Sequence, residues 1–295
     1  MSLAKTALIA HTTNLDLVIR HVLAGLGHGI HAGRERGAGV EFSEYRAYVP
    51  GDEWRRVDWK LAARADRYYV REAERDSHVA VWLVLDASAS MAEASYSVEG
   101  VDKFGYARTL LGCVAAIAQR QGDAFGLVVL GDGKVAFTPA SRGPRQLQRV
   151  LAQLARAEPR GALPDAETLK ASLHFAQSPS AVFAASDLLD WPSPLSVALT
   201  RLRQMRHDVR LLGLQTRAEI EASFPLDQAY RDPEKNDGVF RFGADLREGY
   251  RRNREQHFSA VTAHCRRSDM PLTLAAIEQG PGEVLRRWLR RPGGA

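Results

Sequence analysis

Short apolar runs alternate with stretches of helical periodicity over most of the chain. The clearest run, Val79 to Leu85, contains no polar residue and ends on Asp86. A strand buried on both faces of a parallel sheet has this pattern. Strands are predicted at residues 79–85, 124–130, 134–137, 181–186, 208–214 and 271–276, and helices at 102–121, 143–157, 165–177, 195–206, 245–267 and 281–291. The alternation predicts an α/β fold with a doubly wound, mostly parallel sheet.

Two aspartate-glycine pairs mark departures from this alternation. Asp132-Gly133 precedes the run 134–137, which is therefore predicted to be an antiparallel edge strand. Asp237-Gly238 lies in residues 217–243, which interrupt the alternation and are predicted to form a peripheral hairpin.

The N-terminal quarter of the chain has a different pattern. Residues 14–27 predict a short amphipathic helix, and residues 40–75 alternate aromatic with charged side chains, which favours short strands or hairpins. We therefore expect an N-terminal helix and β extension over residues 1–78 and an α/β domain over 79–295. Residues 40–75 are too few to bury a core, so Trp54 and Trp59 are expected to pack on the sheet domain.

Oxygen-bearing side chains follow two of the predicted strands. Asp86, Ser88 and Ser90 follow the first strand of the α/β domain, and Asp187 follows the strand at 181–186. Ligands of doubly wound sheets bind at the carboxyl ends of strands, near the point where strand order reverses. An oxygen-only donor set suits a hard cation such as Mg²⁺ or Mn²⁺. Alternatively, Asp86 caps the next helix. Because Asp86 is expected at the rim of the sheet and not in the core, its loss should leave the fold nearly intact.

At these four residues the chain resembles a von Willebrand factor A domain. Asp86, Ser88 and Ser90 match the first part of the metal-ion-dependent adhesion site of that family, and Asp187 matches its last aspartate. The resemblance implies a metal with one open position, which a carboxylate of a protein partner fills. The family's middle element is a threonine in a loop before a helix. Here no threonine follows Gly161 directly, so the candidates are Thr168 and Asp165.

A second resemblance covers about residues 25–290. The segment from Gly39 to Arg64, followed by a strand ending in D-x-S-x-S-M, is similar to the signature of the bacterial family called domain of unknown function 58. Its matching residues, of unknown role, are Arg46, Tyr48, Gly51, Asp52, Arg55, Asp58, Trp59 and Arg64. The resemblance implies an AAA+ ATPase of the MoxR type as the companion protein.

Composition excludes several other classes. The chain has 295 residues, 45% hydrophobic and 25% charged, with a net charge of +5 spread among interleaved acids and bases. Nucleic-acid binding usually requires a concentrated basic face, so none is expected. No apolar run is long enough to span a bilayer and no signal peptide is evident, which places the protein in the cytoplasm as the default. The two cysteines, Cys113 and Cys265, predict neither a disulfide nor a zinc site.

The strongest enzymatic alternative is a phosphatase of the haloacid dehalogenase type, in which Asp86 would be the nucleophile. That chemistry requires a second aspartate two residues later as the general acid, whereas position 88 is serine. The sequence therefore favours a non-enzymatic protein-interaction module that binds its partner through a metal ion.

Overall fold

The computed structural model describes residues 15–30, 44–48, 57, 59, 68–72, 80–172, 179–225, 229–231, 239–243 and 245–290. The chain divides into two compact units. Met1–His28 and Val79–Ala295 form one, here called the sheet unit, and Gly29–His78 form the other, here called the insert. The N-terminal helix therefore belongs with the sheet, in contrast to the expected division of the chain at residue 78.

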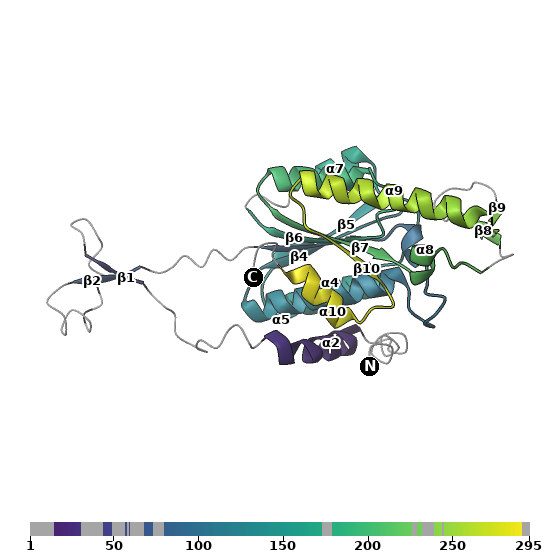
Figure 1. The fold of residues 1–295 in the computed structure, drawn as a ribbon. Helices are drawn as coiled ribbons and strands as arrows, with labels where there is room; N and C mark the ends of the chain where they lie inside the picture. The colour runs from purple at the N-terminus through teal and green to yellow at the C-terminus, as the bar shows by residue number, and fades with distance from the viewer. Residues whose placement is uncertain are drawn as a thin grey trace. The chain divides into compact units, whose positions relative to one another are not determined.

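One six-stranded sheet organises the sheet unit (Figure 1). Its strands are β3 (Val81–Asp86), β4 (Phe125–Gly131), β5 (Lys134–Ser141), β6 (Ala181–Ser186), β7 (Asp208–Gln215) and β10 (Leu272–Ala276). The helices are α2 (Leu15–Ile30), α4 (Lys103–Gln121), α5 (Pro144–Arg156), α6 (Ala166–Ser172), α7 (Pro194–Gln204), α8 (Arg217–Glu221), α9 (Leu246–Arg267) and α10 (Pro281–Leu289), with a 3₁₀ turn, η3, at Ala89–Ala92. The predicted strands and helices of the α/β domain are confirmed, except that residues 173–177 of the helix predicted at 165–177 lie outside the described residues.

The strand order is β10-β7-β6-β3-β4-β5. All neighbours are parallel except β5, which pairs antiparallel with β4 as the Asp132-Gly133 turn predicts. The chain passes from β3 to β4 on one side, whereas β6 lies on the other side of β3. The order of strands therefore reverses between β3 and β6, and this switch point is where such sheets bind ligands.

The sheet is covered on both faces, as its continuous apolar strands require. Alternate residues of β3 point to opposite faces: Leu83 and Leu85 join the core beneath α2, α4, α5 and α10, whereas Trp82 and Val84 join the core beneath α6, α7 and α9. Figure 1 shows these two helical layers on either side of the sheet.

Helix α2 packs onto the layer formed by α4 and α5. Val18, Ile19, Val22 and Leu23 share one helical face, and each is at most 6% exposed. A side chain at Gly112 of α4 would collide with Ile19, so the glycine allows the two helices to approach closely. Burial of this apolar face, at about 1.5–3 kcal/mol for each side chain, is what joins α2 to the sheet unit.

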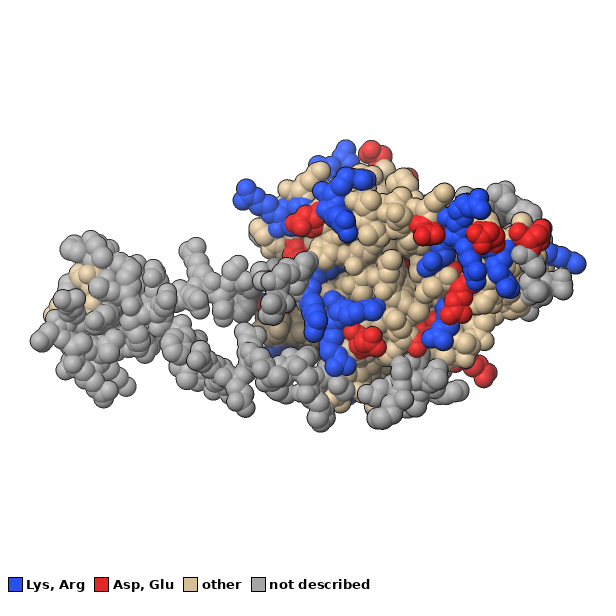
Figure 2. Space-filling view, viewed as in Figure 1, with Lys and Arg blue, Asp and Glu red and all other residues tan. Residues whose placement is uncertain are grey.

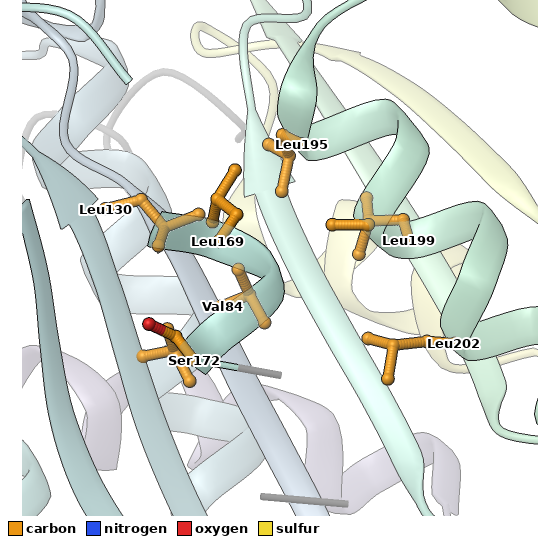
Figure 3. A pocket seen from close by; sticks show the side chains of 9 residues that line it. Val84, Leu130, Leu169, Ser172, Leu195, Leu199 and Leu202 are labelled. Carbon is orange, nitrogen blue, oxygen red and sulfur yellow. The ribbon is translucent and has the colours of Figure 1, made fainter. Parts of the chain in front are cut away.

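The opposite layer contains a small apolar cavity of about 10 Å³ between β3, β4, α6 and α7. Figure 3 shows that leucine side chains, including Leu169, Leu195 and Leu199, line it. The hydroxyl of Ser172 donates its hydrogen bond to the Thr168 carbonyl. A gap of this size and polarity holds at most one water molecule, so it is a packing defect and not a cofactor site.

Residues 217–243 contain the predicted peripheral hairpin, formed by β8 (Ala229–Arg231) and β9 (Val239–Arg241), preceded by α8, which the sequence pattern did not predict. The Asp237-Gly238 pair lies outside the described residues. An aromatic cluster of Phe224, Tyr230, Phe242 and Tyr250 packs edge to face and joins this hairpin to the start of α9.

In the insert, β1 (Glu44–Ala47) and β2 (Tyr69–Glu72) form an antiparallel pair, which confirms short strands in this region. Tyr68 packs edge to face against Tyr48 and Trp59. Trp54 lies outside the described residues, and the packing of Trp59 on the sheet domain stays a prediction. Of the signature residues, Arg46 lies in β1, and five fall outside the described residues: Gly51, Asp52, Arg55, Asp58 and Arg64.

Candidate functional site

Asp86 ends β3 at the switch point and gathers three hydroxyl-bearing side chains. Its Oδ1 accepts hydrogen bonds from the backbone N–H of Ser88 at 2.9 Å and from Ser88 Oγ at 2.6 Å. Its Oδ2 accepts from Ser186 Oγ, at the end of β6, at 2.6 Å. Ser88 Oγ lies 3.2 Å from Ser90 Oγ. Three hydroxyls and a carboxylate from two adjacent strands therefore meet at one point.

Asp187 follows Ser186 and lies on the same edge. Its backbone neighbour Leu188 has a φ of 61°, a left-handed conformation that is uncommon for leucine. Two contacts hold this turn: the Leu188 N–H donates to Ser186 Oγ at 3.0 Å, and His257 of α9 lies 2.8 Å from the Leu188 carbonyl. Unfavourable backbone angles of this kind are common at functional sites.

A buried ion-pair network continues from Asp187. Lys103 Nζ, at the start of α4, lies 3.4 Å from Asp187 Oδ2 and 2.6 Å from Glu219 Oε1 of α8. The lysine side chain is 1% exposed. Burial opposes the charge on Lys103, but the carboxylates of Asp187 and Glu219 outweigh it and hold the lysine pKa above its ordinary value.

The charge balance differs at Asp86, which is 2% exposed. Burial, and then the negative charge of Asp187, raise the Asp86 pKa to about 7, although hydrogen bonds from Ser186 and Ser88 lower it. The carboxylate thus lies where a negative charge is poorly stabilised. It is buried, which corrects the expectation that its place at the rim of the sheet keeps it out of the core.

The alternative role of Asp86 as the cap of the next long helix is not observed. Asp102 caps α4, because its side chain accepts a hydrogen bond from the Gly105 N–H at 2.6 Å. Asp86 instead accepts from the N–H two residues ahead, which fixes the turn that presents Ser88 and Ser90.

The loop before α6 lies against the loop after β3. The Arg160 N–H donates to the Ala87 carbonyl at 2.9 Å, and the Ala89 N–H donates to the Gly161 carbonyl at 2.8 Å. This loop reaches the site through backbone atoms.

Asp165 and Thr168, the candidates for its metal ligand, lie further along. Asp165 is exposed and accepts from the Thr168 N–H at 2.8 Å, which is the geometry of an N-terminal cap. That hydrogen bond lowers the pKa of Asp165. The structure joins these two residues to each other, and no described hydrogen bond joins either to Asp86, Ser88 or Ser90.

Three residues of this edge were not among the predicted ligands: Ser186, Lys103 and Glu219. Ser186 had a visible signal, since it is a hydroxyl residue at a strand end beside Asp187. Lys103 had a weaker one, because a lysine at the start of a helix opposes the helix dipole. Glu219 had none, since it lies 116 residues from its lysine partner.

A shallow pocket of about 260 Å³ adjoins the site on the β4 side. Ala87 and Gly131 line it, together with the basic residues Lys134, Arg156 and Arg160 and the acidic residues Asp132 and Glu158. Lys134 pairs with Asp132 and Arg160 with Glu158, so the pocket carries one positive charge in excess. On the face shown in Figure 2, basic and acidic side chains are interleaved.

Strand order, the antiparallel edge strand and the position of the site at the end of the first strand of the sheet define the fold as von Willebrand factor A-like. Solved structures with similar folds include BatB of Bacteroides thetaiotaomicron and the von Willebrand A domain of SpRpn10. BatB is 15% identical, with a TM-score of 0.43 over 71% of this chain and 98% of that one. The SpRpn10 domain is 12% identical, with a TM-score of 0.43 over 71% of this chain and 94% of that one.

Within this class, the chain belongs to the family described as protein of unknown function DUF58, whose family model matches residues 44–260. The curated relatives include an uncharacterized protein of Mycobacterium bovis and one of Mycobacterium tuberculosis. Each is 27% identical over 275 residues, which cover 90% of this chain and 83% of the relative. The family resemblance read from the signature residues is thereby confirmed.

The structure also describes both cysteines and the helices that could be compared with the thickness of a membrane. Both cysteines, Cys113 and Cys265, are buried and free. None of the described helices is both long enough and apolar enough to cross a bilayer.

Proposed function

We propose that the chain is a non-enzymatic interaction module that binds a protein partner through a divalent cation, Mg²⁺ or Mn²⁺. Asp86, Ser88, Ser90 and Asp187 would hold the ion, which when bound supplies an open coordination position for a carboxylate of the partner. The observation that carries the proposal is the buried Asp86 carboxylate, which hydroxyl groups surround and whose pKa burial and then the negative charge of Asp187 raise to about 7.

The donor chemistry fits such an ion. All the side-chain donors are oxygens, and only two are carboxylates, a set that suits Mg²⁺ better than zinc. A cation beside Asp86 would also stabilise the charge that burial disfavours. Asp165 and Thr168 are not needed for this proposal, because water supplies the remaining ligands of Mg²⁺ in many proteins.

The partner chemistry follows from the same edge. The pocket beside Ala87 carries an excess positive charge from Arg156, which favours an acidic segment next to the carboxylate that reaches the ion. An AAA+ ATPase of the MoxR type is the proposed partner, on the strength of the family resemblance. We propose no nucleic-acid ligand. The proposed location of the protein is the cytoplasm.

The phosphatase alternative has no supporting feature. That chemistry requires a general acid two residues after the nucleophile, and Ser88 donates its hydroxyl proton to Asp86 itself at 2.6 Å. Position 88 supplies a hydroxyl in place of the general acid.

The test compares binding of the purified full chain to its MoxR-type ATPase, with Mg²⁺ and with EDTA. The variants are Asp86→Asn, which keeps the shape of the buried side chain, and Glu255→Gln, a control at an exposed carboxylate of α9 that does not line the pocket. We expect EDTA and Asp86→Asn to weaken binding at least tenfold and Glu255→Gln to change it little. Equal affinity in all four measurements would refute the metal bridge.

A further inference from the structure

Lys103 lies in an unfavourable place for a cation. It is the first residue of α4, where the helix dipole repels positive charge, and the first turn of that helix carries no acidic residue. Its side chain is 1% exposed, so the ammonium group has also lost its hydration. The carboxylates of Asp187 and Glu219, which pair with the lysine, offset most of these two penalties, and the charge of Glu93 adds a smaller contribution.

The two carboxylates are held unequally. Glu219 makes two short contacts, with Lys103 Nζ at 2.6 Å and, through its other oxygen, with the Thr216 N–H at 2.6 Å. The second contact is part of a capping box that fixes Glu219 to α8. Asp187 makes two long contacts, with Lys103 at 3.4 Å and with the Leu189 N–H at 3.3 Å. Asp187 is therefore the partner that can exchange the ammonium group for another cation.

We propose that Lys103 is an internal competitor for the metal ion. Its ammonium group pairs with Asp187 when the ion is absent and remains with Glu219 when the ion binds, so it lowers the affinity of the site. The inference rests on the proposed function, because it concerns the same two carboxylates, and it adds a residue that sets how readily the site loads. It also explains how Asp187 stays paired and buried in the metal-free protein.

Electrostatics gives the sign of each effect. A positive charge a few ångströms from a divalent cation opposes binding, and the effect is large where water is excluded. Removing the lysine and its glutamate partner together takes away one charge of each sign, so neither is left buried and unpaired. Removing the charge of Glu219 alone leaves Asp187 as the ion-pair partner of the Lys103 ammonium group, so the lysine should then compete more strongly with the metal ion.

The experiment titrates the metal-free full chain with Mn²⁺ by calorimetry. The variants are Lys103→Met/Glu219→Gln, Glu219→Gln, and the control Lys170→Met at an exposed lysine of α6. We expect the double variant to bind Mn²⁺ on the order of tenfold more tightly than wild type, Glu219→Gln on the order of tenfold more weakly, and Lys170→Met equally. Thermal unfolding of each variant checks its fold, and Glu219→Gln keeps the test decisive if the double variant does not fold.

The outcomes separate this inference from the proposed function. If wild type binds Mn²⁺ and the double variant binds no more tightly, the role of Lys103 is overturned and the metal site stands. If only the double variant binds, the competition is supported and the metal bridge of the natural chain is overturned. Binding by none of the proteins overturns both.

Discussion

Replacing Asp86 by asparagine should stabilise the metal-free protein, and the gain should depend on pH. The buried carboxylate lies beside Asp187, and its pKa rises from the ordinary 3.8 to about 7. At about 1.4 kcal/mol for each pH unit, ionised Asp86 lowers the free energy of unfolding by about 4 kcal/mol. Asparagine keeps the shape and has no charge to bury.

The sign follows from the protons bound by each state. Between about pH 4 and pH 7 the folded protein keeps a proton on Asp86 that the unfolded chain has lost. The stability of the metal-free wild type therefore falls as the pH rises through this window and is constant above it. The advantage of Asp86→Asn should grow from below about 2 kcal/mol at pH 5 to about 4 kcal/mol at pH 8.

Urea unfolding in EDTA, followed by circular dichroism at several pH values, measures this difference, with Asp132→Asn as the exposed control. Adding Mg²⁺ at pH 8 should stabilise wild type, by about 2.7 kcal/mol at one hundred times the dissociation constant, and should leave Asp86→Asn unchanged. A difference that is constant with pH, or a variant less stable than wild type at pH 8, would refute the reasoning.

Three further predictions concern residues around the site and in the core. Gly131→Ala should destabilise the fold by about 1–3 kcal/mol in urea, because the added methyl group would collide with the Ala87 carbonyl oxygen. Gln146→Leu should lower the free energy of unfolding by about 2–3 kcal/mol, because the Gln146 amide donates at 2.8 Å to one carbonyl in β4 and to one in β5. For either variant, a loss of stability below about 0.5 kcal/mol would contradict the prediction. A thiol reagent should label Cys113 only in urea, since burial raises the pKa of its thiol, and rapid labelling of the native protein would contradict this.

Much of the fold was predictable because short stretches of sequence are enough to identify its strands. The run that forms β3 is apolar on both faces, and the Asp132-Gly133 pair fixes β5 as the antiparallel edge. The place of α2 was not predictable in this way. Its apolar face is visible in the sequence, but the surface that it covers is made by α4 and α5, far along the chain.

Part of the candidate site was likewise predictable from local sequence, and part was not. Asp86, Ser88 and Ser90 lie within one loop, so local spacing was enough to group them, and a strand end supplied Asp187. The buried lysine network could not be found in this way, because the Lys103 partners lie 84 and 116 residues away in sequence. Only the folded sheet brings the starts of α4 and α8 together at its carboxyl edge.

The division of the chain into a sheet unit and an insert makes the sheet unit discontinuous in sequence. The peptide chain leaves it in the last turn of α2 and returns just before β3. Four buried apolar side chains, and not the covalent connection, keep α2 on its neighbours. A single break inside residues 29–78 would therefore leave two polypeptides that remain associated, in the manner of complementing fragments.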